Sequence, residues 1–119
     1  MAEHNDTGKK GEELAVGHLL KNGFSILETN WRFRHLEVDI IAMKNNMLVF
    51  LEVKTRFSSA FGAPEEFVDK TKQRNLRTAA NAYVQTKNMD LEVRFDIISI
   101  LMKKDQAPAI HHLEDAFLF

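Results

Sequence analysis

Acidic and basic side chains lie close together on two segments that have the pattern of a β-hairpin. Residues 36–43 and 47–56 are predicted strands, separated by the turn-forming pair Asn45-Asn46. If these two asparagines form the whole loop, the numbers of paired residues sum to 91, and Asp39 faces Glu52. Directly opposed side chains have Cβ atoms about 5 Å apart, so two carboxylates there either share a proton or share a cation. The spacing therefore predicts a site where both acids bind one Mg²⁺ or Mn²⁺ ion.

The same numbering opposes Glu37 to Lys54, on the sheet face expected to hold Asp39 and Glu52. Apolar residues surround these charges, which favours a buried hairpin; they are Val38, Ile40, Val49, Phe50, Leu51 and Val53. A solvated hairpin with alternating charges stays open as the alternative. The Glu52-x-Lys54 triplet is weak evidence by itself, because roughly one such triplet is expected by chance in this composition.

A third acidic residue is predicted on the apolar stripe of the first helix, which we expect from Gly8 to Asn22 with Gly23 closing it. Glu12 falls in the arc occupied by the apolar residues Ala15, Val16, Leu19 and Leu20. A carboxylate in that position is costly without a partner, so Glu12 is a candidate functional residue. The alternative is that Glu12 only complements the positive end of the helix dipole.

A second helix is expected from Pro64 to Lys87, after a loop over residues 57–63. Lys72 lies in the middle of its apolar stripe, which consists of Val68, Leu76, Ala79, Ala80 and Tyr83. We expect Lys72 to lie near the acidic cluster; a lysine that extends from the core edge into solvent is the alternative.

The opposite side of the second helix is basic, with Lys70, Arg74, Arg77 and Asn81 grouped together. Residues 54–87 hold seven basic and three acidic residues, although the whole chain has a formal charge of −1. A basic face of this kind suits the phosphates of a nucleic acid, and a solvated helix surface is the alternative. We include Arg56, at the end of the second hairpin strand, among the expected nucleic-acid contacts.

Length and composition limit the class of protein. A chain of 119 residues with 45% hydrophobic residues predicts one domain over residues 1–119, with residues 1–7 expected to be flexible. Cysteine is absent, which excludes disulfide scaffolds, thiolate metal sites and cysteine nucleophiles. With no apolar run long enough to cross a bilayer and no signal peptide, we expect a cytoplasmic protein without a membrane partner.

The remaining strands are expected at residues 24–33, 91–102 and 107–113. They give the order αβββαββ and an α/β domain around a mixed sheet. We expect structural roles for the polar residues outside the hairpin. His18 is predicted to be a packing residue, and His111 and His112 are predicted to be solvated on opposite faces of a strand. Asp96 is predicted to be buried and to pair with Arg94 or with a backbone amide. Gly8 and Gly11 are expected to allow close helix packing.

A set of motifs that covers nearly the whole chain resembles the YraN-like bacterial family. The motifs are Gly8-Lys9-Lys10-Gly11-Glu12, Asn30-Trp31-Arg32, Glu37-Val38-Asp39-Ile40-Ile41, Val49-Phe50-Leu51-Glu52-Val53-Lys54-Thr55-Arg56, Phe61-Gly62-Ala63-Pro64, Lys72-Gln73-Arg74, Ala79-Ala80, Tyr83, Arg94-Phe95-Asp96 and Ala116-Phe117. This pattern is in turn similar to the PD-(D/E)XK nucleases, especially the archaeal-type Holliday-junction resolvases. The resemblance implies a restriction-endonuclease-like fold with a Mg²⁺ site on its central sheet.

The resemblance assigns roles by position. Asp39 and Glu52 match the metal-binding acids, Lys54 the motif lysine, Glu12 the first-helix glutamate of the resolvases, and Lys72-Gln73 the polar pair of the following helix. Leu36 replaces the usual glycine and Val38 replaces the motif proline, but neither change removes a ligand. A homodimer is implied by the same analogy.

These observations predict a metal-dependent endonuclease acting on DNA, with branched or structured DNA as a possible substrate. Asp39, Glu52 and Glu12 would hold Mg²⁺, Lys54 would act in catalysis, Glu37, Lys72 and Gln73 would support the site, and Arg56, Lys70, Arg74 and Arg77 would contact the nucleic acid. Two alternatives stay open. The first is a protein that binds nucleic acid on the same fold without cutting it, and the second is a protein-interaction module.

Overall fold

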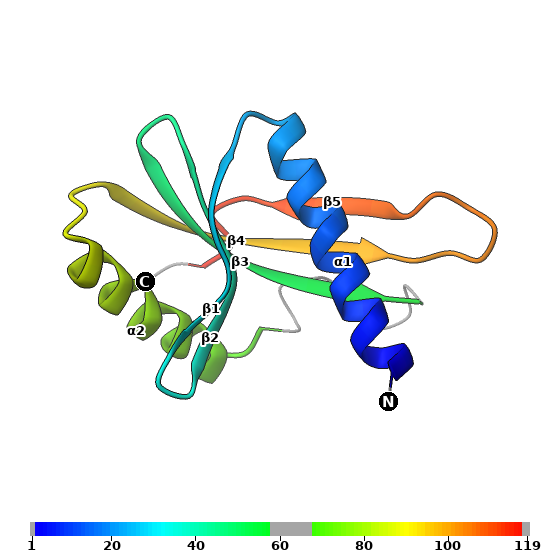
Figure 1. Ribbon diagram of the computed structural model, residues 1–119, viewed down its shortest axis with the longest axis horizontal. Helices are drawn as coiled ribbons and strands as arrows, with labels where there is room; N and C mark the ends of the chain where they lie inside the picture. Colours follow the sequence, from blue (N-terminus) through cyan, green and yellow to red (C-terminus); the bar gives the residue numbers. More distant parts are fainter. Residues whose placement is uncertain (1, 58–67, 118–119) are drawn as a thin grey trace.

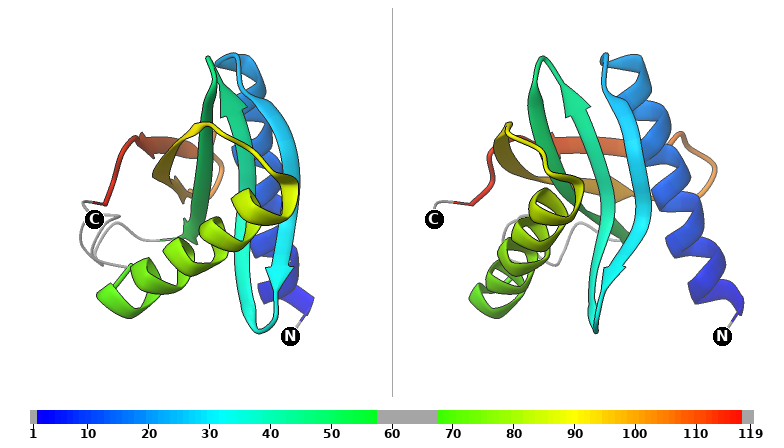
Figure 2. Two further views of the ribbon diagram at one scale, coloured as in Figure 1. Left: turned by 90° about the vertical axis from the view of Figure 1, so that its left-hand side faces the viewer. Right: turned by 60° about the vertical axis from the view of Figure 1, so that its left-hand side comes forward.

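A mixed five-stranded sheet with a helix on each face forms the framework of the protein (Figures 1 and 2). The computed structural model describes residues 2–57 and 68–117, with side chains from residue 8 onward. In chain order the elements are α1 (Ala2–Lys21), β1 (Ser25–Phe33), β2 (Leu36–Lys44), β3 (Met47–Arg56), α2 (Lys70–Lys87), β4 (Glu92–Leu101) and β5 (Ala109–Leu113). The predicted order αβββαββ is confirmed, and it is compatible with a restriction-endonuclease-like fold.

The strands lie in the order β1-β2-β3-β4-β5, so each strand pairs with its neighbour in the sequence. Three of the four pairs are antiparallel, and β3 and β4 are parallel. Parallel neighbours require a crossover connection, and α2 lies within this one. Both strands of the parallel pair are buried at their centres, as expected where a sheet is covered on both faces.

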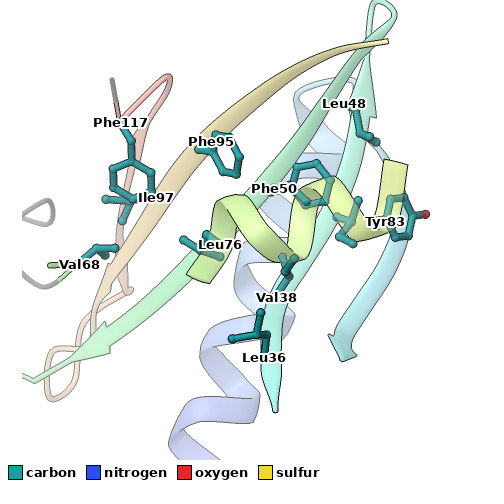
Figure 3. Close-up of a cluster of buried hydrophobic side chains, with 13 residues drawn as sticks. Leu36, Val38, Leu48, Phe50, Val68, Leu76, Tyr83, Phe95, Ile97 and Phe117 are labelled. Carbon is teal, nitrogen blue, oxygen red and sulfur yellow. The ribbon is translucent and has the colours of Figure 1, made fainter. Parts of the chain in front are cut away.

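Two separate cores fix the helices to the sheet. The α2 helix packs on one face through Leu76, Ala79, Ala80 and Tyr83, which contact a cluster that includes Val38, Phe50 and Phe95 (Figure 3). On the other face, Ala15 and Leu19 of α1 pack with Ile40, Val49 and Ile98. Alternate residues of β3 therefore serve opposite cores, as period-two burial requires.

Helix boundaries differ from the predicted ones at both N-termini. The α1 helix begins at Ala2, six residues before the predicted start at Gly8. The α2 helix begins at Lys70 and not at Pro64, because Asp69 has an extended backbone and its carboxylate accepts a hydrogen bond from the Lys72 amide at 2.8 Å. Pro64 and most of the predicted loop of residues 57–63 lie outside the described residues.

Both helices end where the sequence indicates. Gly23 follows α1 with a φ of 85°, and Asn88 caps α2 with a φ of 53°. Such left-handed residues are typical of helix C-termini. Leu20 is an exception to the predicted apolar arc, since its side chain is 57% exposed. Among the described residues, neither helix is long and apolar enough to cross a membrane.

Candidate active site

The β2–β3 hairpin has the predicted register over its distal half. Five pairs, from Lys44↔Met47 to Ile40↔Leu51, have residue numbers that sum to 91. Asn45 and Asn46 form the two-residue turn with φ values of 51° and 63°, the left-handed conformation that such a loop requires. Asp39 and Glu52 occupy the next positions, where the two strands diverge, and Figure 1 shows β1 and β2 turning away from the end of β3.

The Asp39 side chain lies in the opening between the diverging strands. Its Oδ2 accepts a hydrogen bond from the Val53 backbone amide at 2.8 Å, so a carboxylate replaces the carbonyl that a continued ladder would offer. Burial, and then the charge of Glu52, raises the pKa of Asp39 to about 7, and the Val53 amide and Lys72 only partly offset this increase. Glu12 also contributes to it, so the three acids share one electrostatic environment.

Regular side-chain alternation along β2 is interrupted at Asp39. Val38 belongs to the core under α2, whereas Ile40 belongs to the core under α1. Residues two apart on a regular strand point to the same side of the sheet. The side chains of Val38 and Ile40 point to opposite sides, so the regular alternation of β2 is broken between them. The interruption places Asp39 at the boundary between the two cores.

Glu52 is almost completely buried, with 3% of its surface exposed, and two lysines neutralise it. Lys72 Nζ of α2 lies 2.8 Å from Glu52 Oε1, and Lys54 Nζ lies 3.6 Å from the same oxygen. Burial acts to lower the pKa of Lys72, but the hydrogen bond to Glu52 and the charges of Glu52 and Asp39 outweigh burial and raise it. Lys72 thus extends from the stripe on α2 to the acidic pair.

Glu12 approaches the site from α1, which lies very close to β3 at this point. A Cβ atom on Gly11 would overlap the Thr55 hydroxyl, so only glycine permits this approach of the helix. The packing role predicted for Gly11 is therefore confirmed, whereas Gly8 has open space around its Cα and the same prediction is wrong there. Glu12 Oε2 accepts a hydrogen bond from Asn30 Nδ2 of β1 at 3.0 Å.

Two predicted supporting residues have other partners. Glu37 does not oppose Lys54 as predicted, because it forms an ion pair with Arg32 of β1 at 3.0 Å and Lys54 contacts Glu52. The β2–β3 ladder ends before this position, which explains the difference. Gln73 Nε2 donates to the Val68 carbonyl at 3.1 Å, a contact that holds the chain entering α2.

The predicted basic face of α2 forms on the solvent side of that helix. Lys70, Arg74 and Arg77 are exposed, opposite the buried residues that contact the sheet. Arg56 is partly buried at the end of β3, where its carbonyl accepts a hydrogen bond from Met102. The α2 helix thus presents Lys72 to the acidic pair, and Lys70, Arg74 and Arg77 to solvent.

A second polar network lies at the other end of α1 and was missed by sequence reasoning. Asp96 is fully buried and accepts hydrogen bonds from Arg94 and from the Asp115 amide, as predicted. It also contacts His112 Nε2 at 2.8 Å, and His112 Nδ1 contacts His18 Nε2 at 3.1 Å. The prediction of a solvated His112 is therefore wrong, whereas His111 is exposed as predicted. His18 packs edge-on against the His112 ring, which agrees with its predicted packing role, and its hydrogen bond to His112 was not predicted.

The electrostatics of this second network suit a structural role. Burial alone would raise the pKa of Asp96, but hydrogen bonds from His112, Arg94 and the Asp115 amide together lower it. Burial and then the neighbouring His112 lower the pKa of His18. The network connects α1, β4 and β5 through side chains that all have partners.

The fold and the first site together define an α/β protein with a partly buried acidic cluster on its central sheet, bordered by lysines. In the part of the chain that the structure describes, no three carboxylate or histidine side chains are arranged as a metal-binding group. The sequence model of the uncharacterised protein family UPF0102 matches residues 11–100. The chain therefore belongs to the UPF0102 family, and the predicted YraN-like resemblance is confirmed.

Relatives match this chain over nearly its whole length. A UPF0102 protein of Flavobacterium psychrophilum is 54% identical over 117 residues, which cover 98% of both chains. A UPF0102 protein of Flavobacterium johnsoniae is 50% identical, and the match again covers 98% of this chain and 98% of the relative. A third, from Christiangramia forsetii, is 49% identical over 100% of this chain and 99% of its own length.

Proposed function

We propose that this protein is a Mg²⁺-dependent endonuclease acting on DNA, with branched or otherwise structured DNA as the substrate class. The main observation in support is that the charges of Asp39 and Glu52 act on each other where β2 and β3 diverge, with Lys54 and Lys72 in contact with Glu52. Two acids in a partly buried position are unfavourable without a cation, and the raised pKa of Asp39 reflects that cost.

The donor set suits Mg²⁺, which prefers oxygen ligands. This ion is commonly held by one or two carboxylates together with substrate phosphates, so a complete protein cage of three ligands is not required. Asp39 and Glu52 would supply two carboxylates, and Glu12 would supply a third or hold a coordinated water. Bound there, the ion would activate water and neutralise charge on the phosphate. The Lys72 ammonium contacts Glu52 Oε1 at 2.8 Å, so Mg²⁺ would bind the other oxygen of that carboxylate or displace the lysine.

The two lysines of the site would then interact with the scissile phosphate or with the attacking water. Lys54 would orient the attacking water or stabilise negative charge in the transition state. Lys72, beside the proposed metal site, would be placed to donate to a phosphate oxygen. Lys70, Arg74 and Arg77 would contact the DNA backbone farther along α2, since all three side chains are exposed.

Cleavage assays on four-way junctions and on plain duplexes, each with Mg²⁺ and with EDTA, test the proposal. We expect Asp39→Ala and Lys54→Ala to reduce the cleavage rate by about 100-fold or more. Glu92→Ala is the control, because this exposed residue lies at the start of β4, at the far end of β3 from the site. Wild-type rates in both site variants would contradict the mechanism.

One observation favours a second candidate, a protein that binds nucleic acid without cutting it. Glu52 already has two lysine partners, so the acidic pair is partly neutralised without a metal. This candidate predicts salt-dependent DNA binding that Arg74→Gln and Arg77→Gln weaken and Glu52→Gln does not. Lys103→Gln and Lys104→Gln are charge-matched controls, because these exposed lysines follow β4 in the loop toward β5. DNA cleavage by the wild type would exclude this candidate.

The resolvase resemblance also supports a homodimer as part of the proposal. Light scattering at micromolar concentration, with and without a junction, measures the oligomeric state. A monomer both with and without the junction would contradict the proposed homodimer.

A further inference from the structure

Asn30 has an unusual backbone for a residue in the middle of a strand. Its φ is 51°, in the left-handed region, although Thr29 and Trp31 on either side pair with Ile40 and Val38 of β2. Asn30 and Asp39 are the positions left out between these two pairs. The distortion of β1 at Asn30 therefore lies directly opposite Asp39, where the side-chain alternation of β2 is broken.

The left-handed backbone coincides with a side-chain contact to the acidic cluster. The Asn30 amide Nδ2 donates to Glu12 Oε2 at 3.0 Å across the space between β1 and α1. An open groove of about 310 Å³ lies here, lined by Lys9, Glu12, Glu13, Val16, Thr29 and Asn30. Because the groove leaves Glu12 only partly buried, the amide fixes a carboxylate that otherwise has room to rotate.

We propose that Asn30 is a positioning residue, which holds the Glu12 carboxylate toward Asp39 and Glu52 so that it takes part in Mg²⁺ binding. The proposal rests on the proposed function, because it assigns Asn30 to the same metal site. A hydrogen bond from a neighbouring side chain to a metal ligand orients that ligand, and its loss typically weakens metal affinity by 10- to 100-fold.

The residue type follows from two requirements at one position. A left-handed backbone is costly for most L-residues, and asparagine tolerates it better than other residues with a large side chain. The contact to a carboxylate requires a donor, which the amide provides. Aspartate meets only the first requirement, because it would place a second carboxylate against Glu12. Glycine also meets only the first, because it has no side chain.

These differences provide the variants for a test. Asn30→Gly keeps the backbone conformation and removes the donor, and Asn30→Ala also removes the donor without adding charge. Asn46→Gly is the matched control, since Asn46 has a φ of 63° in the exposed hairpin turn. Thermal melts of each protein without metal measure folding. Melts over a Mg²⁺ series give the concentration for half-maximal stabilisation.

We expect Asn30→Gly and Asn30→Ala each to need about tenfold more Mg²⁺ than the wild type. Without metal, the melting temperatures of Asn30→Gly and Asn46→Gly should shift by similar amounts. A merely structural role for Asn30 would lower the metal-free melting temperature and leave the Mg²⁺ midpoint unchanged.

Failure of the positioning role and failure of the proposed function give different results. If the wild type responds to Mg²⁺ and both Asn30 variants respond at the same concentration, the positioning role is wrong and the proposed function stands. If Asn30→Gly does not fold, the Mg²⁺ midpoint of Asn30→Ala decides between the same two outcomes. If the wild type shows neither Mg²⁺-dependent stabilisation nor Mg²⁺-dependent cleavage, the proposed function fails and the positioning role fails with it.

Discussion

The Asp39 carboxylate accepts its 2.8 Å hydrogen bond from the Val53 amide just beyond the last β2–β3 pair, Ile40↔Leu51. A side chain thus continues the ladder for one bond after the backbone of β2 has turned away. The contact fixes Asp39 beside Glu52 without a regular pairing of the strands. It also brings a carboxylate into a partly buried position, where its charge is costly.

Replacing Asp39 by asparagine should stabilise the protein at neutral and alkaline pH. The pKa of Asp39 is raised from 3.8 to about 7 in the fold, so between these two values the folded state binds more protons than the unfolded state. Wild-type stability therefore falls as pH rises through this window, by an amount on the order of a few kcal/mol. The amide oxygen of the substituted side chain can still accept from Val53, so only the charge is lost.

Thermal melts at pH 5 and pH 8 measure this effect. We expect Asp39→Asn to melt about 5 °C or more above the wild type at pH 8, with a smaller advantage at pH 5. Mg²⁺ should stabilise the wild type at pH 8 and leave the variant nearly unchanged. An equal advantage at both pH values would contradict the assignment of the raised pKa to Asp39.

Removing Lys72 should make the site more receptive to Mg²⁺. Lys72 Nζ contacts Glu52 Oε1 at 2.8 Å, so the ammonium competes with an incoming cation for that oxygen. We expect Lys72→Met to lose about 1 kcal/mol of stability without metal, since the lysine is partly exposed. Its Mg²⁺ midpoint in thermal melts should be lower than that of the wild type. Lys70→Met, an exposed neighbour, is the control, and an unchanged midpoint in Lys72→Met would contradict the competition.

The close approach of α1 to β3 should not tolerate a methyl group at Gly11. A Cβ there would overlap the Thr55 hydroxyl, so Gly11→Ala should destabilise the protein by about 1–3 kcal/mol and displace the adjacent Glu12. Gly17→Ala is a matched control on the same helix, with no atom within 4 Å of the added Cβ. It should be neutral or stabilising by up to about 1 kcal/mol, because alanine favours helix. Denaturant unfolding measures both, and equal effects would contradict the contact.

The His18–His112 pair should make stability depend on pH in the opposite direction to Asp39. The pKa of His18 is lowered in the fold, so below its unfolded value of 6.5 the unfolded state binds more protons. This contribution to stability is present above pH 6.5 and is lost as pH falls further. The charged or titratable neighbours in the network are His112, Asp96, Arg94 and Glu114.

Comparing variants separates the pH dependence of stability that comes from His18 from the pH dependence that comes from Asp39. The difference in melting temperature between the wild type and His18→Gln should shrink as pH falls from 7.5 to 5.5. His111→Gln, which alters the exposed neighbour of His112, is the control for replacing an imidazole on the same strand. A pH-independent difference for His18→Gln would contradict the lowered pKa.

Local patterns in the sequence predicted much of the fold. The bounds of β3 are those predicted, and the turn at Asn45-Asn46 fixes the hairpin register, because a two-residue loop allows only one pairing of the flanking strands. Period-two burial along β3 and the stripe of α2 identified the core. Asp69 also marks the start of α2 in the sequence, because aspartate is a preferred N-cap residue and its carboxylate accepts from the Lys72 amide.

The sequence by itself therefore determined which elements form, and it determined the hairpin register from the turn as far as Ile40↔Leu51. The pairing of Asp39 with Glu52 that the same register predicts does not form, because the ladder ends one position before it. Only the tertiary structure decided that β2 and β3 diverge there, that Asn30 reaches Glu12 and that His18 meets His112. The last two contacts join residues 18 and 94 positions apart in the chain. Side-chain periodicity reports only which face of an element is apolar, whereas these contacts depend on how far two packed layers approach each other. That distance is set by details such as the missing side chain at Gly11.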